Sequence, residues 1–422
     1  MAGDVITEGT TRQQTLEDYA SIVGPGEIDD LSSLAVPLAG KSVRMVNSTA
    51  VGGGVAEILN RLIPLLNELG LETKWDVITG GDDFFEVTKG FHNALHGMPY
   101  TPKPEDFEIF TTYTERNRQG KEMNEDFVVI HDPQPAGLIQ SRPPNRNHWV
   151  WRCHIDLSRP HPEVWSFFEQ FVRRYDAALF SSPNFSRQLS IPQYLFYPTI
   201  DPLTEKNREL EPKQIRDVLE KFHIDPERPI ITQVSRFDRL KDPIGVIQAY
   251  KQVKKFVPRC QLVLAGGGAK DDPEGGAVLK EVEEVADGDP DVHILNLPPW
   301  SAFEINALQR GSTIIVQKSL KEGFGLTVTE GLWKKKPVVA SAVGGIPLQI
   351  IHKFTGMLSH SIEGTAFQIR FLLSNPDVAQ RLGEQGHEHV KNNFLITNNL
   401  RNYISLFLAL SRKVEPLFPE GT

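Results

Sequence analysis

The sequence lacks the features that mark secreted, membrane-spanning and nucleic-acid-binding proteins. Only two of its 422 residues are cysteines, Cys153 and Cys260, which excludes a disulfide framework and a cysteine-based metal site. No apolar run approaches the roughly 20 residues that a membrane-spanning helix requires, and the first residues show no signal-like basic and apolar pattern. The net charge of -9 argues against nucleic acid or an anionic membrane as the main partner. We therefore expect a protein of the reducing cytoplasm whose partners are small molecules.

Common cofactor and metal motifs are also missing. The glycines at 266–268 are not followed by the Gly-Lys-Ser/Thr of a P-loop. Asp287 and Asp289 resemble an acidic metal–diphosphate pair, but they fall in a Gly/Pro-rich turn after a polar helix. His387 and His389 lie on different faces of a predicted helix, which is the wrong geometry for one metal. The sequence therefore predicts no metal site and no required cofactor, and it leaves stimulation by Mg²⁺ open.

Both halves of the chain alternate short apolar runs with amphipathic segments. A strand at 42–47 and a helix at 56–69 begin the first half, and a strand at 230–234 and a helix at 243–256 belong to the second. A proline-stiffened stretch at 197–203 indicates a crossover between them. The pattern predicts an α/β fold of two Rossmann-like, doubly wound domains that face a ligand cleft.

The domain boundaries follow from this alternation. Residues 1–37 are polar and then punctuated by glycine and proline, which predicts a surface extension with one short helix. Residues 38–202 and 203–392 form the two predicted domains. Residues 393–422 include an amphipathic helical segment that we expect to pack back across the first domain.

Residues 319–330 carry the clearest functional pattern. They follow a β-branched run at 312–316 that fits a buried strand, and a helix-like sequence begins at Leu326. Such a turn lies at the carboxyl edge of an open α/β sheet, where ligands bind. Gly323 and Gly325 let the backbone approach a ligand closely, and the N–H groups at a helix start attract anions.

Two carboxylates bracket this turn, Glu322 in the loop and Glu330 in the second turn of the predicted helix. About 10 Å or less separates them, given a rise of about 1.5 Å per helical residue. A sugar-nucleotide needs amides for its charged centre, one carboxylate for sugar hydroxyls and another for ribose hydroxyls. On spacing alone, an ordinary αβ connection with exposed glutamates fits equally well.

Two basic residues follow another predicted strand. Arg236 and Lys241 lie five residues apart in one loop. A guanidinium fork and a compact ammonium could together neutralise a leaving diphosphate, and such an electrostatic contribution is usually the largest one available to a catalyst. A solvated basic loop explains the pair taken alone; the pair together with the glycine and glutamate turn favours a ligand site.

The first half offers a glycine loop and two histidines at strand ends. Gly52, Gly53 and Gly54 precede a predicted helix, which suits either a diphosphate or a tight turn, and they lack the spacing of a nicotinamide-binding turn. His131 and His154 each follow an apolar strand, so both are expected at the same edge of the sheet. A structural role stays open for either histidine.

Together these residues resemble the retaining GT-B glycosyltransferases of the glycogen and sucrose synthase group, over residues 40–392. The segments 91–97, 150–156 and 319–330 are further similar to the trehalose glycosyltransferring synthases. The resemblance implies a GT-B fold with an acceptor domain followed by a nucleotide-sugar domain. It also implies reversible transfer of glucose from UDP-glucose or ADP-glucose to free glucose, which forms α,α-trehalose with retention. A homodimer is compatible with it.

The resemblance implies roles for the donor side. Arg236 and Lys241 grip the diphosphate, Glu322 holds glucose hydroxyls, and Glu330 holds the ribose. His154 lies near the C6 hydroxyl of the donor sugar and the leaving group. The remaining donor-binding residues are expected to act through backbone close approach or amides: Gly53, Gly54, Gly323, Phe324, Gly325 and Leu326.

The acceptor side is less well defined, and its weaker candidates are His131, Asp132 and Asn93. The nucleotide base is expected near residues 293–298, where backbone contacts would accept uridine or adenosine.

The expected mechanism follows from the lack of an obvious second carboxylate at the donor face. Retaining glycosidases use two carboxylates about 5 Å apart, one of them a nucleophile. We therefore expect a front-face route, in which the leaving diphosphate accepts the proton of the incoming hydroxyl. The alternatives are a trehalose phosphorylase, another retaining GT-B glucosyltransferase, a sugar-nucleotide epimerase of the same fold, and a sensor that binds without catalysis.

Overall fold

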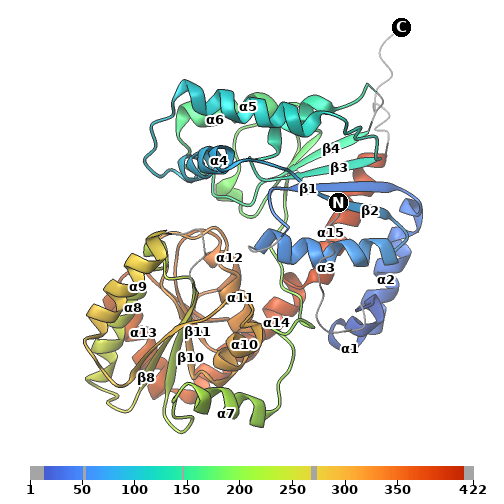
Figure 1. The fold of residues 1–422 in the computed structure, drawn as a ribbon. Helices are drawn as coiled ribbons and strands as arrows, with labels where there is room; N and C mark the ends of the chain where they lie inside the picture. Colours follow the sequence, from blue (N-terminus) through green and yellow to red (C-terminus); the bar gives the residue numbers. More distant parts are fainter. Residues whose placement is uncertain (1–13, 51–53, 145–146, 268–272, 413–422) are drawn as a thin grey trace.

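The computed structural model describes residues 14–50, 54–144, 147–267 and 273–412. It contains two six-stranded sheets in which every neighbouring pair of strands runs parallel (Figure 1). The strand order is β2-β1-β3-β4-β5-β6 in one sheet and β12-β11-β10-β7-β8-β9 in the other. The prediction of two doubly wound α/β sheets is confirmed. No helix in the described ranges has the length and apolar character needed to cross a membrane.

The first sheet and its helices form what we call the N-terminal lobe. Its strands are β1 (Ser42–Asn47), β2 (Glu72–Val77), β3 (Phe127–His131), β4 (His148–Arg152), β5 (Ala177–Phe180) and β6 (Gln193–Leu195). Its helices are α3 (Gly54–Glu68), α4 (Asp82–Leu95), α5 (Pro104–Arg118) and α6 (Pro162–Val172).

The second sheet and its helices form the C-terminal lobe. Its strands are β7 (Ile230–Val234), β8 (Gln261–Gly266), β9 (Val292–Asn296), β10 (Ile314–Gln317), β11 (Val338–Ser341) and β12 (Met357–Ser359). Its helices are α7 (Pro212–Lys221), α8 (Pro243–Lys254), α9 (Pro273–Ala286), α10 (Ala302–Gly311), α11 (Leu326–Trp333), α12 (Ile346–Gln349), α13 (Ile362–Ser374) and α14 (Pro376–Asn393).

Apolar patterning explains these elements. Every residue of β3, β7 and β10 is buried, as expected of strands covered by helices on both faces of a parallel sheet. In α3, residues at helical spacing form one fully buried stripe that contacts the sheet. The stripe comprises Ile58, Leu59, Leu62, Leu65 and Leu66.

The N-terminal segment differs from the prediction. In place of a surface extension with one short helix, the chain forms two 3-10 turns (Leu16–Tyr19 and Val36–Leu38) and two helices, α1 (Ala20–Val23) and α2 (Pro25–Ala35). Leu16, Tyr19 and Leu31 are buried in the core cluster that also contains the α3 stripe. The reason is that these apolar side chains pack into the core and add to it a second face beside α3.

The last helix, α15 (Ile396–Ser411), lies against α2 and α3 (Figure 1). Its Phe407 ring stacks on Phe127 of β3 at 4.4 Å between centroids. The chain therefore returns from the C-terminal lobe to complete the core of the N-terminal lobe.

The strand order places the site. In the second sheet β7 lies between β8 and β10, so the strands that follow β7 in the chain are added on opposite sides of it. Ligands bind at such a topological switch point. The loops after β7 and β10 are therefore neighbours, and the Leu320 N–H donates to the Leu240 carbonyl at 2.8 Å. The lobes also touch, because the Lys321 ammonium donates to the His96 carbonyl at the end of α4.

Candidate active site

Two cavities lie between the lobes. The first, of about 360 Å³, is called the cleft cavity here. The second, of about 560 Å³, is called the linker cavity, because residues 199–201 and 204–207 of the connection between the lobes line it. The cleft cavity is lined by residues that the sequence singled out in both lobes: Gly54, His154, Arg236, Lys241, Glu322, Phe324, Gly325, Leu326 and Glu330. The two cavities share five lining residues: Glu57, Ile58, Lys206, Leu326 and Glu330.

The closest ion pair in the cleft cavity joins Lys241 to Glu322. The Lys241 Nζ lies 2.6 Å from Glu322 Oε2, and the Ser319 hydroxyl donates to the same oxygen at 3.1 Å. Lys241 ends a 3-10 turn that Asp238 caps by accepting the Leu240 N–H at 2.7 Å. This cap fixes the direction in which the lysine leaves the backbone.

Arg236 lies on the same loop and lines the same cavity. Its side chain is 54% exposed, and its guanidinium lies 3.2 Å from the Asp238 carboxylate. The two cations therefore differ: Lys241 pairs with a buried carboxylate, whereas Arg236 is more than half exposed and pairs with Asp238 of its own loop. Both are placed to bind an anion in the cleft.

The glycine turn after β10 is fixed by backbone constraints. Gly325 caps α11 with a φ of +83°, a conformation that favours glycine. A Cβ at Gly344 would lie 1.7 Å from the Glu322 carbonyl oxygen, so a second segment passes directly behind the loop. The Gly345 N–H also donates to the Gly323 carbonyl at 2.9 Å. The N-terminus of α11 is thereby presented to the cleft cavity, where it favours anions.

His154 enters the cavity from the N-terminal lobe with two supporting partners. The Nδ1 of His131 lies 3.1 Å from the Nε2 of His154, and their rings stack at 5.4 Å. Asp132, which has a φ of +67°, accepts the His154 backbone N–H at 2.8 Å. The structure thus places His131 and Asp132, which were expected on the acceptor side, directly against His154.

These imidazoles are neutral. Burial, with a further contribution from Arg152, lowers the pKa of His131 to about 3. Burial also lowers the pKa of His154 well below its usual value, helped by Arg152 and His131. Because neither ring is charged near neutral pH, one ring donates an N–H to the other, and the tautomers of the two rings are coupled. Burial raises the pKa of Asp132 to about 6.

The end of α4 contacts the loop after β10 of the other lobe, where Lys321 donates to the His96 carbonyl. Asn93 is exposed there, between His92 and His96, whose ring centroids are 4.7 Å apart. Burial lowers the pKa of His92, and Arg236 is among the charges that lower it further. His92 and His96 were not singled out from the sequence, although both fall in the segment 91–97 on which the family resemblance rested.

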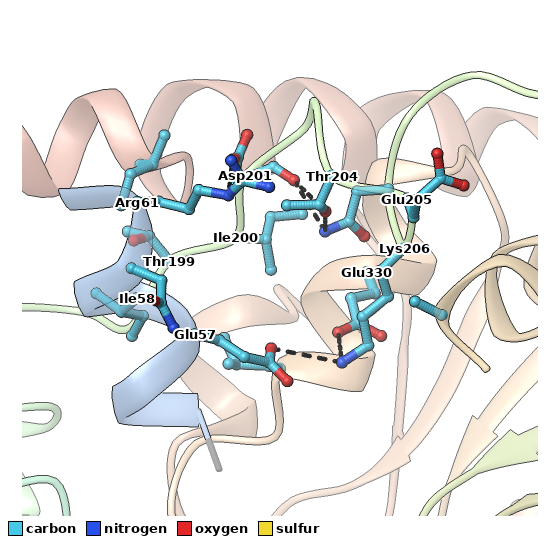
Figure 2. Close-up of a pocket in the computed structure, with 15 residues that line it drawn as sticks. Glu57, Ile58, Arg61, Thr199, Ile200, Asp201, Thr204, Glu205, Lys206 and Glu330 are labelled. Atoms are coloured by element: carbon cyan, nitrogen blue, oxygen red, sulfur yellow. Dashed lines mark hydrogen bonds and ion pairs between the residues drawn. The ribbon is translucent and has the colours of Figure 1, made fainter. Parts of the chain in front are cut away.

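Glu330 is almost fully buried, and both of its carboxylate oxygens have partners. Oε1 lies 3.1 Å from the Lys206 ammonium, and Oε2 accepts from the Gln309 amide at 3.1 Å. Figure 2 shows Lys206 between Glu330 and Glu57, at the boundary of the linker cavity. Lys206 belongs to no motif, and sequence reasoning missed it.

The first glycine loop is only partly described. Gly53 lies outside the described residues, whereas Gly54 is the first residue of α3. A Cβ at Gly54 would lie 3.3 Å from Leu326 Cδ1, so the start of α3 adjoins the start of α11 where both line the cleft cavity. Gly323 faces His154 in the same way, since its Cβ would lie 3.6 Å from the His154 carbonyl oxygen.

The motifs rejected as metal sites have structural partners. The Asp289 carboxylate accepts from the Lys254 ammonium at 2.6 Å, and His387 Nδ1 contacts the Trp333 carbonyl. Within the described ranges, no three His, Cys, Asp or Glu side chains cluster as metal ligands would.

Comparison with known proteins gives the family. Residues 45–187 match the model "Trehalose synthase, N-terminal domain", and residues 214–389 match "Glycosyl transferases group 1". The trehalose synthase of Pyrococcus horikoshii is 43% identical over 96% of this chain and 99% of its own length. The chain belongs to the trehalose synthase family.

Two further relatives of this trehalose synthase family member are more distant. A trehalose phosphorylase of Pleurotus pulmonarius is 28% identical over 95% of this chain and 62% of its own length. The solved UDP-forming α,α-trehalose-phosphate synthase of Burkholderia xenovorans superposes with a TM-score of 0.72 at 14% identity, covering 89% of this chain and 100% of that chain. The two-sheet architecture is therefore the GT-B fold of glycosyltransferases, as predicted.

Proposed function

We propose that this chain is a retaining glucosyltransferase that moves glucose from UDP-glucose or ADP-glucose to free glucose and forms α,α-trehalose. The observation that carries the proposal is the Lys241–Glu322 pair beside Arg236, in a cavity that His154 enters from the other lobe. A cation pair suits the diphosphate, and a carboxylate suits the hydroxyls of the sugar attached to it. Similarity to trehalose synthases supports the choice of product.

The proposed reaction breaks the bond between glucose C1 and the diphosphate oxygen. The hydroxyl of the acceptor glucose forms a new bond to C1 on the same face, and its proton passes to the departing diphosphate. Arg236 and Lys241 stabilise the negative charge that grows on the leaving group, and the N-terminus of α11 adds its dipole. No carboxylate nucleophile is needed.

His154 contributes position rather than charge in this scheme. Because burial keeps its imidazole neutral, the ring can exchange hydrogen bonds with a sugar hydroxyl without repelling the developing positive charge at C1. The contact between Lys321 and the end of α4 joins the lobes beside the cleft and helps to exclude water from the reacting atoms.

A direct test is incubation of the purified protein with UDP-glucose or ADP-glucose plus free glucose, with the disaccharide identified by NMR. We expect α,α-trehalose and release of the nucleoside diphosphate. If no donor yields trehalose, this function is excluded. Conversion of the donor sugar without added glucose would indicate an epimerase instead.

Phosphorolysis of trehalose is the second candidate, since a trehalose phosphorylase aligns with nearly the whole chain. A buried carboxylate at the ribose position has no purpose in that reaction, and Glu330 therefore favours a nucleotide donor. Incubation with trehalose and inorganic phosphate, without nucleotide, separates the two: formation of glucose 1-phosphate would support the phosphorylase.

A further inference from the structure

The chain around Lys206 is held rigidly against the C-terminal lobe. The Asn306 amide of α10 donates to the carbonyls of Glu205 and Arg208, both at 2.8 Å. The Asn207 carbonyl accepts from Arg310 at 3.0 Å and from the Trp333 indole at 3.2 Å. The backbone of Lys206 is therefore fixed on both sides, and only its side chain is free to change partners.

The Lys206 ammonium lies where the two cavities meet. It contacts Glu330 of the C-terminal lobe at 3.1 Å and Glu57 of the N-terminal lobe at 3.6 Å (Figure 2). Lys206 and both carboxylates line the linker cavity and the cleft cavity. The Glu330 carboxylate raises the pKa of Lys206, burial lowers it, and Glu57 raises it again, so the pKa is raised overall. A ligand that extends from one cavity into the other must pass this charged ammonium.

A lysine beside a carboxylate matches the hydrogen-bonding needs of a vicinal diol. A carboxylate only accepts hydrogen bonds, so Glu330 can take the protons of two hydroxyls. Each hydroxyl oxygen then still has lone pairs that require a donor in a buried site. Lys206 supplies up to three N–H donors beside Glu330 Oε1, whereas Gln309 already donates to Oε2.

We propose that Lys206 is a specificity-determining residue for ribose in the donor nucleotide. Its ammonium donates to a ribose hydroxyl whose proton is accepted by Glu330, so that the two side chains together recognise the diol and discriminate against 2′- and 3′-deoxyribose. The proposal rests on the proposed function, in which Glu330 holds the ribose. It predicts that ribose recognition is lost in part when Glu330 is intact but Lys206 is replaced.

The test measures binding of ADP and UDP and of their 2′-deoxy and 3′-deoxy forms by titration calorimetry, which needs no turnover. For Lys206→Met we expect the preference for ribose over the more weakly bound deoxy form to fall by about tenfold, the effect of losing one charge-assisted hydrogen bond. Lys221→Met is the matched control, because it breaks an exposed Lys–Glu pair 3.0 Å long on the same lobe; its preference should equal that of the unaltered chain.

Loss of Lys206 leaves a buried carboxylate without its ammonium, so folding of each variant is checked by thermal unfolding. In a Glu330→Gln background, which has no such carboxylate, adding Lys206→Met is expected to reduce the ribose preference again. If Lys206→Met leaves the preference for ribose unchanged in both the unaltered chain and the Glu330→Gln variant, the proposal for Lys206 is overturned. The proposed function is then unaffected. If the unaltered chain binds none of these nucleotides, both are overturned.

Discussion

The two walls of the cleft cavity differ in charge. The wall from the C-terminal lobe carries Arg236 and the Lys241–Glu322 pair, on loops at the switch point of the sheet. The wall from the N-terminal lobe carries the half-buried, neutral imidazole of His154, which pairs with the buried, neutral imidazole of His131, and it also carries the Glu57 carboxylate. The difference suits the proposed reaction, whose charge change is concentrated on the leaving group. Under that proposal Arg236 and Lys241 face the diphosphate, and the neutral imidazole of His154 faces the sugar together with the Glu322 carboxylate.

The walls also differ in how their side chains are held. Lys241 and Arg236 extend from a capped loop, and water can reach the Arg236 guanidinium. His154 is instead fixed by a ring partner and by Asp132, within a largely apolar core. Removing a charge should therefore lower kcat most. Removing a group that supports His154 should lower kcat less, by disturbing the position of the His154 ring. The following predictions test that division.

Lys241→Ala should have the largest effect. The variant loses the ammonium nearest Glu322, and its kcat should fall by about 10² to 10³, because one preorganised charge no longer stabilises the leaving group. Trehalose formation under saturating donor measures the loss. Arg239→Ala is the control: Arg239 lies two residues earlier in the same turn but pairs with Glu281 at the surface, so its kcat should stay within about threefold. Near-normal turnover in Lys241→Ala would show that the Lys241 ammonium does not take part in the mechanism.

His131→Phe should have the next largest effect. Phenylalanine keeps the stacking on His154 but loses the bond between the two rings, so His154 is free to rotate and to exchange tautomers. We expect kcat to fall by about tenfold, a modest positioning effect, with the affinity for the nucleoside diphosphate unchanged. Steady-state kinetics and calorimetry measure the two quantities. A loss of nucleotide affinity as large as the loss of kcat would show that the His131–His154 pair also binds the nucleotide.

The His131–His154 pair should also make the free energy of unfolding depend on pH. The pKa of His131 is about 3 in the folded protein and about 6.5 in an unfolded chain. Between these values the unfolded chain binds more protons, so the free energy of unfolding falls as pH falls below about 6.5. His154 acts in the same direction, and the raised pKa of Asp132 opposes both. The Tm measured from pH 7.5 to pH 5 should fall less steeply in His131→Phe; an identical slope would contradict the neutral pair.

The two walls were not equally predictable from the sequence. Arg236, Lys241 and Glu322 each stand beside a recognisable turn, but their contact depends on β7 and β10 being neighbours, which strand order decides and local patterning does not. The strand-end position of His154 was visible, whereas its ring contact with His131 depends on the pairing of β3 with β4. Lys206 had no local signal at all, because its role comes from carboxylates 149 residues before it and 124 residues after it in the chain.

Local patterning does not mark every element. Helix α5 has few buried apolar residues, and its buried positions include Thr114 and Asn117. Strands β6 and β12 have only three residues each. None of these elements contributes a residue to the cleft cavity, so the site does not depend on predicting them.

Gly54→Ala should have the smallest effect. It tests whether a ligand occupies the space that a side chain at residue 54 would fill. The added Cβ would lie 3.3 Å from the flexible Leu326 δ-methyl, which can move by the few tenths of an ångström required, and the backbone N–H of residue 54 is retained. We expect kcat and nucleotide affinity to change by no more than about threefold. The Tm should hold or rise slightly, since alanine reduces the conformational freedom of the unfolded chain.

Gly325→Ala is the contrasting variant, because its φ of +83° is strained for alanine and its Cβ would lie 3.1 Å from Glu322 Cγ. A loss of nucleotide affinity in Gly54→Ala larger than in Gly325→Ala would show that the ligand itself occupies the space beside Gly54, and the anion-binding surface would then include the N-terminal lobe.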